Sequence, residues 1–138
     1  MRIEFYAIVT RFQTEPLQLV CRICEKACAS GQPVAVLVDD QETAEALDQL
    51  LWEFKPDAYV PHQIAGDEDD EYTAVLIVPP GAPHGPRPLW INLRDAAAPD
   101  GAERLIELIP ADDAAKTAAR QRWRAYQARG HQPQRVEI

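Results

Sequence analysis

The 138-residue sequence lacks the patterns of a membrane or secreted protein. No apolar run approaches the roughly 20 residues needed to cross a bilayer. Glu4 interrupts the short apolar stretch near the N-terminus, and no small-residue cleavage site follows, which is unlike a signal peptide. The three cysteines are an odd number, which argues against a disulfide framework and suits a reducing compartment. We therefore expect one domain over residues 1–138 that stays in the cytoplasm, away from membranes.

Glycine is also scarce, and none of the six residues belongs to a phosphate-binding loop. Neither Gly-x-x-x-x-Gly-Lys-Ser/Thr nor Gly-x-Gly-x-x-Gly occurs, so the backbone amides cannot approach a nucleotide phosphate closely. Asp39 and Asp40 follow a predicted strand at a place where some α/β folds bind ribose. Capping of the next helix is the favoured interpretation of these aspartates. We expect no nucleotide cofactor.

No group of residues forms a recognisable catalytic or metal site. Cys21, Cys24 and Cys28 share a helix face with Leu17, and no second cysteine pair or closely spaced histidine pair completes a four-ligand zinc site. Core packing is therefore their expected role. The acidic run 67–71 lacks the alternating ligands and the glycine of a calcium loop. None of the three histidines lies in a pattern typical of a nucleophilic triad. The sequence predicts no catalytic residue, no metal and no cofactor.

Apolar runs of strand length alternate with amphipathic segments of helical length. The predicted strands cover 3–9, 34–38, 73–78, 89–93 and 105–109. The predicted helices cover 17–29, about 42–54, and a last segment from 111–113 to about 128. The proline-rich segment 79–88 can be neither helix nor central strand. This alternation predicts an α/β fold of three layers, with a mostly parallel sheet flanked by helices.

The charge is distributed unevenly along the chain. The formal net charge is −8, which alone would discourage a nucleic-acid partner. Yet residues 114–136 hold six basic residues and no acidic one, and the rest of the chain holds the other eight basic residues and all 22 acidic ones. Such a division indicates a charged partner at the C-terminal end.

The last predicted helix concentrates this basic charge on one stripe. With Lys116 as the origin and about 100° per residue, Arg120 lies at about 40°, Trp123 at about −20° and Arg124 at about 80°. Arginines beside a large apolar ring suit a ligand that is both anionic and apolar. Single-stranded nucleic acid and an acidic peptide with an apolar end both fit. A basic surface helix without a ligand is the third interpretation, and the residues alone favour none of the three.

Three stretches of the sequence resemble the chi subunit of bacterial DNA polymerase III. They are Phe5-Tyr6, the block 51–66 with its Val-Pro-His-x-x-Ala-Gly core, and the run 118–126 with Arg-x-Arg-Trp-Arg-Ala-Tyr. The resemblance implies a non-catalytic adaptor of the replication machinery, with a fold that resembles a nucleotide-binding domain but has no nucleotide site.

The resemblance also implies a partner for the basic helix. The family binds the acidic C-terminal tail of single-stranded-DNA-binding protein, which ends in Ile-Pro-Phe or a similar sequence. By position, Lys116, Arg120 and Arg124 would face the carboxylates of the tail. Trp123, where a tyrosine is common in the family, and Ile109 would shape the pocket for the terminal phenylalanine. Direct binding of single-stranded DNA by the same helix is the alternative, which the charge of −14 outside the basic segment disfavours.

A second surface is implied to bind the psi subunit, which would link the chain to the clamp loader. Its residues are Trp52, Phe54, Tyr59, Val60 and Pro61. They lie around a Lys-Pro break where the aromatic side chains cannot all turn inward, and an exposed aromatic patch commonly marks a partner site. The alternative is that these residues only close the core. A helicase is a further candidate partner, and we expect a monomer or a heterodimer with psi.

Overall fold

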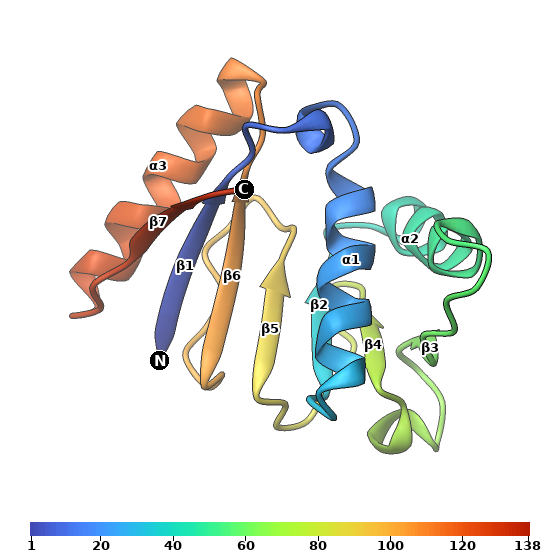
Figure 1. Cartoon of the computed structure of the whole chain (residues 1–138). Coiled ribbons are helices and arrows are strands. Elements are labelled where there is room, and N and C mark those ends of the chain that lie inside the picture. The colour runs from blue at the N-terminus through green and yellow to red at the C-terminus, as the bar shows by residue number, and fades with distance from the viewer.

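The computed structural model describes all 138 residues and contains one parallel sheet of seven strands (Figure 1). The strands are β1 (Arg2–Ala7), β2 (Val34–Leu37), β3 (His62–Ile64), β4 (Val75–Val78), β5 (Leu89–Asn92), β6 (Arg104–Ile109) and β7 (Gln134–Glu137). The α-helices are α1 (Pro16–Ala29), α2 (Gln41–Glu53) and α3 (Asp113–Ala128), and two short 3-10 helices are η1 (Arg11–Gln13) and η2 (Asp70–Tyr72). The strand order is β3-β4-β2-β5-β6-β1-β7. The predicted α/β fold with helices flanking a parallel sheet is confirmed.

The helices divide between the two faces of the sheet, α1 and α2 on one and α3 on the other (Figure 1). Alternate residues of β2 show the division, because successive side chains of a strand point to opposite faces. Val34 and Val36 pack with α1 and α2, whereas Ala35 and Leu37 belong to the cluster that includes α3. All four residues of this central strand are buried, as a near-continuous apolar strand requires.

Two helices begin at aspartates that cap them. The Asp40 carboxylate accepts a hydrogen bond from the Thr43 backbone N–H at 2.7 Å, and the Asp112 carboxylate accepts one from the Ala115 N–H at 2.9 Å. Each satisfies an amide that the first helical turn leaves unpaired. Asp39 accepts a hydrogen bond from the Asp95 N–H at 2.8 Å, so both aspartates after β2 have structural partners. The helix-capping interpretation is confirmed for Asp40.

The edge strands β3 and β7 were not among the predicted elements. Each is short and carries polar side chains, His62-Gln63 in β3 and Gln134-Arg135 in β7. An edge strand has only one neighbour and one protected side, so it needs no apolar alternation to form. Its hydrogen bonds come from the strand beside it, which the local sequence does not reveal.

The proline-rich segment 79–88 contains neither helix nor strand, as predicted, but a buried arginine at its end holds it in place. The Arg87 guanidinium donates to four backbone carbonyls, including those of Thr73 and Asp70 at 2.7 Å each. Charged donors satisfied in this way tie the loop to the start of β4 and to η2.

No helix of the protein combines the length and the apolar character that crossing a membrane requires.

The buried face of α1 yields a testable prediction about its thiols. Cys21 and Cys24 are fully buried and Cys28 is half-buried. Burial raises the pKa of Cys21 to about 12 and also raises that of Cys24, so both stay protonated and unreactive at mildly alkaline pH. We expect a thiol reagent at about pH 8 to modify Cys28 alone in the native protein and all three cysteines in denaturant. Equal reaction rates for the three native thiols would contradict this packing.

Candidate functional site

A pocket lies between α3 and the sheet edge formed by β6, β1 and β7, and we call it the α3 pocket. Its volume is about 530 Å³. The lining residues are Phe5, Ile109, Lys116, Ala119, Arg120, Trp123, Arg124, Gln127 and Arg135. Four of them are cationic and none is acidic, in a chain with 22 acidic residues. The pocket is therefore a local cationic site on an anionic protein.

Three of the four cations have no partner within the protein. The side chains of Lys116, Arg120 and Arg124 form no ion pair and no hydrogen bond. By contrast, five other arginines of the protein form ion pairs with carboxylates. Arg120 and Arg124 are exposed and Lys116 is half-buried. Their charge is thus available to an anion from outside. Because guanidinium groups bind carboxylates and phosphates in a bidentate manner, the pocket can accept either.

Aromatic and aliphatic side chains line the inner part of the pocket. The ring of Trp123 packs on Phe5 of β1, with 4.9 Å between the ring centroids and an angle of 50° between the planes. Both Trp123 and Ile109 are partly buried and pack against the apolar cluster on this face of the sheet. Trp123 is therefore neither fully outward nor part of the closed core. It leaves an apolar surface recessed among the cations.

A buried polar network fixes how α3 lies on the sheet. Glu107, in the middle of β6, has no exposed surface, and Arg122 is 8% exposed. Arg122 Nε donates to Glu107 Oε1 at 3.0 Å, the Tyr126 hydroxyl donates to Glu107 Oε2 at 2.6 Å, and Asn92 Nδ2 donates to the same oxygen at 2.9 Å. The Tyr126 oxygen in turn accepts the backbone N–H of Ala98 at 2.9 Å. Every charge in this network has a partner, which a buried ion pair requires.

The network sets the rotation of α3 about its own axis. Arg122 and Tyr126 are four residues apart and so lie on one side of the helix, facing the sheet. Burial raises the pKa of Glu107, and the nearby Arg122 charge opposes that rise. Burial likewise raises the pKa of Tyr126, so its hydroxyl remains a hydrogen-bond donor. With this side turned inward, the stripe of Lys116, Arg120 and Arg124 faces the pocket.

The five residues predicted for this site all line the same pocket, namely Ile109, Lys116, Arg120, Trp123 and Arg124. Sequence reasoning missed Phe5 and Arg135, which reach the pocket from strands far away along the chain. It also counted Arg122 only as one of six basic residues. A glutamate inside an apolar strand, with an Arg–Tyr pair four residues apart on a helix, was the available signal for the network.

An exposed aromatic pair lies at the other end of the sheet, where α2 ends. Trp52 is 57% exposed and Tyr59 is 72% exposed, with 6.3 Å between their ring centroids. Trp52 also packs against the His62 ring at 4.7 Å. Nitrogen Nε2 of that histidine lies 3.0 Å from the Asp48 carbonyl oxygen, so the ring below Trp52 is fixed. We call Trp52 and Tyr59 the aromatic pair.

The other three residues predicted for the aromatic surface differ from the pair. Val60 is 2% exposed and packs in the core with α2, so it supports the surface from below and cannot contact a partner directly. Phe54 and Pro61 are partly buried, and the Arg22 guanidinium lies 5.8 Å from the Phe54 ring centroid. The expectation that Val60 belongs to the contact surface is wrong for this structure.

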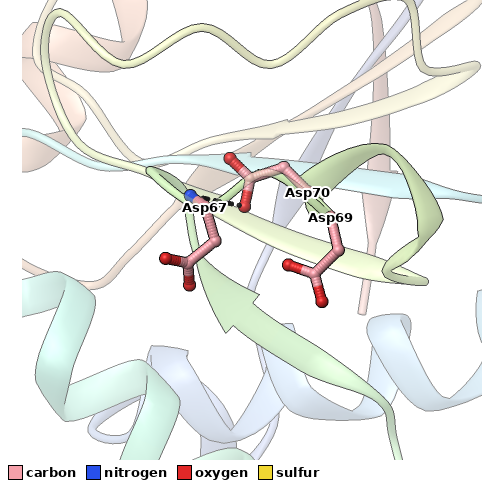
Figure 2. Close-up of side chains that lie close together, drawn as sticks. All are labelled: Asp67, Asp69 and Asp70. Carbon is pink, nitrogen blue, oxygen red and sulfur yellow. Dashed lines mark hydrogen bonds between the residues drawn. The ribbon is translucent and has the colours of Figure 1, made fainter.

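A third group of polar residues lies at the start of η2, where Figure 2 shows three aspartates close together. One carboxylate oxygen each from Asp67, Asp69 and Asp70 lies within 4.8 Å of the other two. The Asp70 carboxylate accepts hydrogen bonds from the Gly66 and Asp67 backbone amides at 2.8 and 3.2 Å. These hydrogen bonds stabilise a turn that brings the three aspartates close together. Their proximity therefore has a structural cause, and we assign no metal site to them.

The fold and the α3 pocket define an α/β domain whose recessed site is cationic and lies beside the sheet edge. The family model for the DNA polymerase III chi subunit, HolC, matches residues 1–134. The chain therefore belongs to the chi subunit family, which comprises accessory subunits of DNA polymerase III. This confirms the resemblance noted in the sequence.

Chi subunits of other bacteria are similar to the chain over most of their length. The chi subunit of Pseudomonas aeruginosa is 32% identical over 133 residues, which cover 94% of this chain and 92% of the relative. That of Escherichia coli is 31% identical over 116 residues, with 82% and 79% coverage. That of Haemophilus influenzae is 28% identical over 131 residues, with 92% and 90% coverage.

Solved structures with the same fold include larger proteins of much lower identity. Saccharomyces cerevisiae Dbp5 bound to Gle1 and IP6 superposes with a TM-score of 0.70 at 13% identity, and T4 UvsW with 0.65 at 9%. The matches cover 99% of this chain but only 42% and 41% of those chains, so the chain spans about two fifths of their length. At such identity the likeness describes the fold alone.

The buried network generates a prediction about stability. Replacing Arg122 by methionine leaves the Glu107 charge buried without its partner, which should lower the free energy of unfolding by about 3–5 kcal/mol in a urea titration. Arg120→Met on the exposed side of α3 is the matched control, with an expected change within about 0.5 kcal/mol. The double variant Arg122→Met/Glu107→Gln should recover part of the loss.

The Arg122→Met loss should also depend on pH. Burial raises the pKa of Glu107 in the folded protein above its unfolded value, and removal of Arg122 strengthens that rise. Glu107 of the folded variant then binds a proton more readily than Glu107 of the unfolded chain. The loss in free energy of unfolding, relative to the unchanged protein, should therefore become smaller as the pH falls from about 7 to about 5. A deficit that is constant over this range, or equal losses for Arg122→Met and Arg120→Met, would contradict the network as described.

Proposed function

We propose that the chain binds the acidic C-terminal tail of single-stranded-DNA-binding protein in the α3 pocket. One observation carries this proposal, namely an acid-free pocket in which three cations without internal partners surround a recessed apolar floor. A peptide that carries carboxylates and ends in a large apolar residue complements both features. As a chi subunit, the protein would thereby connect the polymerase assembly to coated single-stranded DNA.

The pocket residues divide between the two parts of such a ligand. Arg120 is central in the cationic stripe and is the best placed to bind a terminal carboxylate, with Lys116 and Arg124 one turn away on either side. Trp123 and Ile109 provide the apolar surface for the terminal aromatic side chain. The terminal carboxylate and the aromatic ring would then be held in one place, which requires a free C-terminus on the ligand.

Single-stranded DNA is the alternative ligand, and the charge distribution argues against it. Residues outside 114–136 carry a net charge of −14, from eight basic and 22 acidic residues, which repels a long phosphate chain. A short tail avoids that repulsion because only its end enters the pocket. One pocket of this size gives modest affinity, but many tails on one DNA-bound filament raise the effective concentration.

Calorimetric titration with a synthetic acidic peptide ending in phenylalanine tests the proposal. Arg120→Ala and Trp123→Ala should each weaken binding about tenfold or more, because a charge-assisted hydrogen bond or a buried aromatic contact is lost. Gln121→Ala is the matched control, since Gln121 is exposed on α3 but does not line the pocket. Amidation of the peptide terminus should weaken binding to a similar degree, and added salt should weaken it further.

The proposal fails if the affinities of both pocket variants equal that of the unchanged protein. Titration with a labelled single-stranded oligonucleotide, at low salt and without any protein partner, tests the alternative that α3 binds DNA directly. Tight binding of the oligonucleotide that Arg120→Ala abolishes would replace the peptide with DNA as the ligand of this helix.

We further propose that the aromatic pair binds the psi subunit and so joins the chain to the clamp loader. Exposed tryptophan and tyrosine on a fixed base are typical of an interface centre, and Trp52 rests on the immobilised His62 ring. A helicase is a further candidate for the same surface. Strands β3 and β7 are the opposite edges of the sheet (Figure 1). Trp52 packs on His62 of β3 and Arg135 of β7 lines the α3 pocket, so the two partners would not compete for the same surface.

Replacement of Trp52 by alanine should weaken psi binding by about 2 kcal/mol, or roughly 30-fold, as measured by calorimetry or by co-purification. Tyr72→Ala provides a matched control, because Tyr72 is an aromatic residue that is even more exposed, at 82%, but lies in η2 and not in the aromatic pair. Affinity for the tail peptide should remain unchanged in both variants. A Trp52→Ala protein that binds psi normally would remove the aromatic pair from the interface.

A further inference from the structure

The fourth cation of the α3 pocket, Arg135, comes from strand β7 and not from the helix. It lies one residue beyond the part of the chain that the chi family model matches. Parallel pairing sets Arg135 beside Phe5 of β1, whose ring packs on Trp123. The arginine therefore faces α3 across the apolar floor of the pocket, so the cationic groups lie on two sides of the floor.

The sheet ends at β7, so no neighbouring strand restricts access from that side (Figure 1). The side chain of Arg135 is 55% exposed. A peptide whose end is held on the apolar floor can leave the pocket either along α3 or over this open edge. Each extended residue spans about 3.4 Å, so a few residues suffice to pass from the floor to β7.

Arg135 forms an ion pair with Glu137 of the same strand. The Arg135 Nη1 atom lies 3.0 Å from Glu137 Oε1, and the glutamate side chain is 63% exposed. An ion pair this exposed contributes little free energy, so an incoming carboxylate can replace Glu137 readily. The same glutamate also repels an acidic ligand. Arg135 and Glu137 should therefore have opposite effects on an anionic peptide.

We infer that the binding site continues from the α3 pocket onto β7, where Arg135 binds acidic residues that precede the anchored end of the ligand and Glu137 competes with them. This inference rests on the proposed function and specifies the ligand further. The partner is an acidic segment several residues long, not only a terminal dipeptide. Affinity then increases with the acidic residues upstream of the terminal aromatic.

Two peptides and two variants test the inference. The long peptide carries four or five acidic residues before its apolar end, and the short peptide has that end alone. Arg135→Gln should weaken the long peptide about two- to fivefold, and Glu137→Gln should strengthen it by a similar factor, as expected for exposed charge pairs. The affinity of the short peptide should change less in either variant, because that peptide has no acidic residues upstream of its apolar end to reach β7. Both effects should fade as the salt concentration rises.

Arg2→Gln is the charge-matched control, since Arg2 is exposed at the start of β1 and does not line the pocket. An unchanged affinity of the long peptide for Arg135→Gln and Glu137→Gln overturns the inference, as does an equal loss for long and short peptides. Arg120→Gln in the same series distinguishes failure of the extension to β7 from failure of the proposed function itself. If Arg120→Gln weakens binding of the long peptide about tenfold or more while Arg135→Gln has no effect, only the extension to β7 fails. If neither Arg120→Gln nor Trp123→Ala weakens binding, the proposed function fails as well.

Discussion

The buried contact between Glu107 and the Arg122–Tyr126 side of α3 determines which residues of this helix face the pocket. A carboxylate without exposed surface in the middle of β6 needs charged and hydrogen-bonding partners, and only α3 supplies both. That demand turns Arg122 inward. Since residues of a helix have fixed angular positions, the neighbouring arginines at 120 and 124 must then face away from this contact, toward the pocket. One polar interaction inside the fold thus orients a charged surface outside it.

The pocket depends on the contrast between this surface and the rest of the protein. An isolated cation on a neutral surface attracts an anion weakly once salt screens it. Here the cations gather around an apolar floor, and none of the 22 acidic residues lines the pocket. A ligand must bring negative charge and an apolar group together to gain from both. Under the proposed function, this requirement would favour an acidic tail over a long nucleic acid, and the distant aromatic pair would leave the α3 pocket free while a second protein binds.

Much of the fold followed from the sequence because its signals are local. The apolar runs of β2 and β4, the aspartate cap of α2 and the 3.6-residue period of α3 each act within a few residues, and so did the cationic stripe with Trp123. Edge strand β7 and the pocket residues Phe5 and Arg135 depend on pairing across the sheet, which local patterns do not encode. Val60 was included in the second surface through the family resemblance of its block, but its own burial depends on packing in the core with α2.

The three tryptophans allow a direct measurement of the central claim, because each has a different environment. Trp123 lines the pocket, Trp90 is buried with no hydrogen-bond partner for its indole N–H, and Trp52 is exposed in the aromatic pair. In an NMR titration of the 15N-labelled indoles with the acidic peptide, the account predicts a large shift of the Trp123 signal and little change in the other two. A shift of the Trp52 signal with Trp123 unmoved would contradict it.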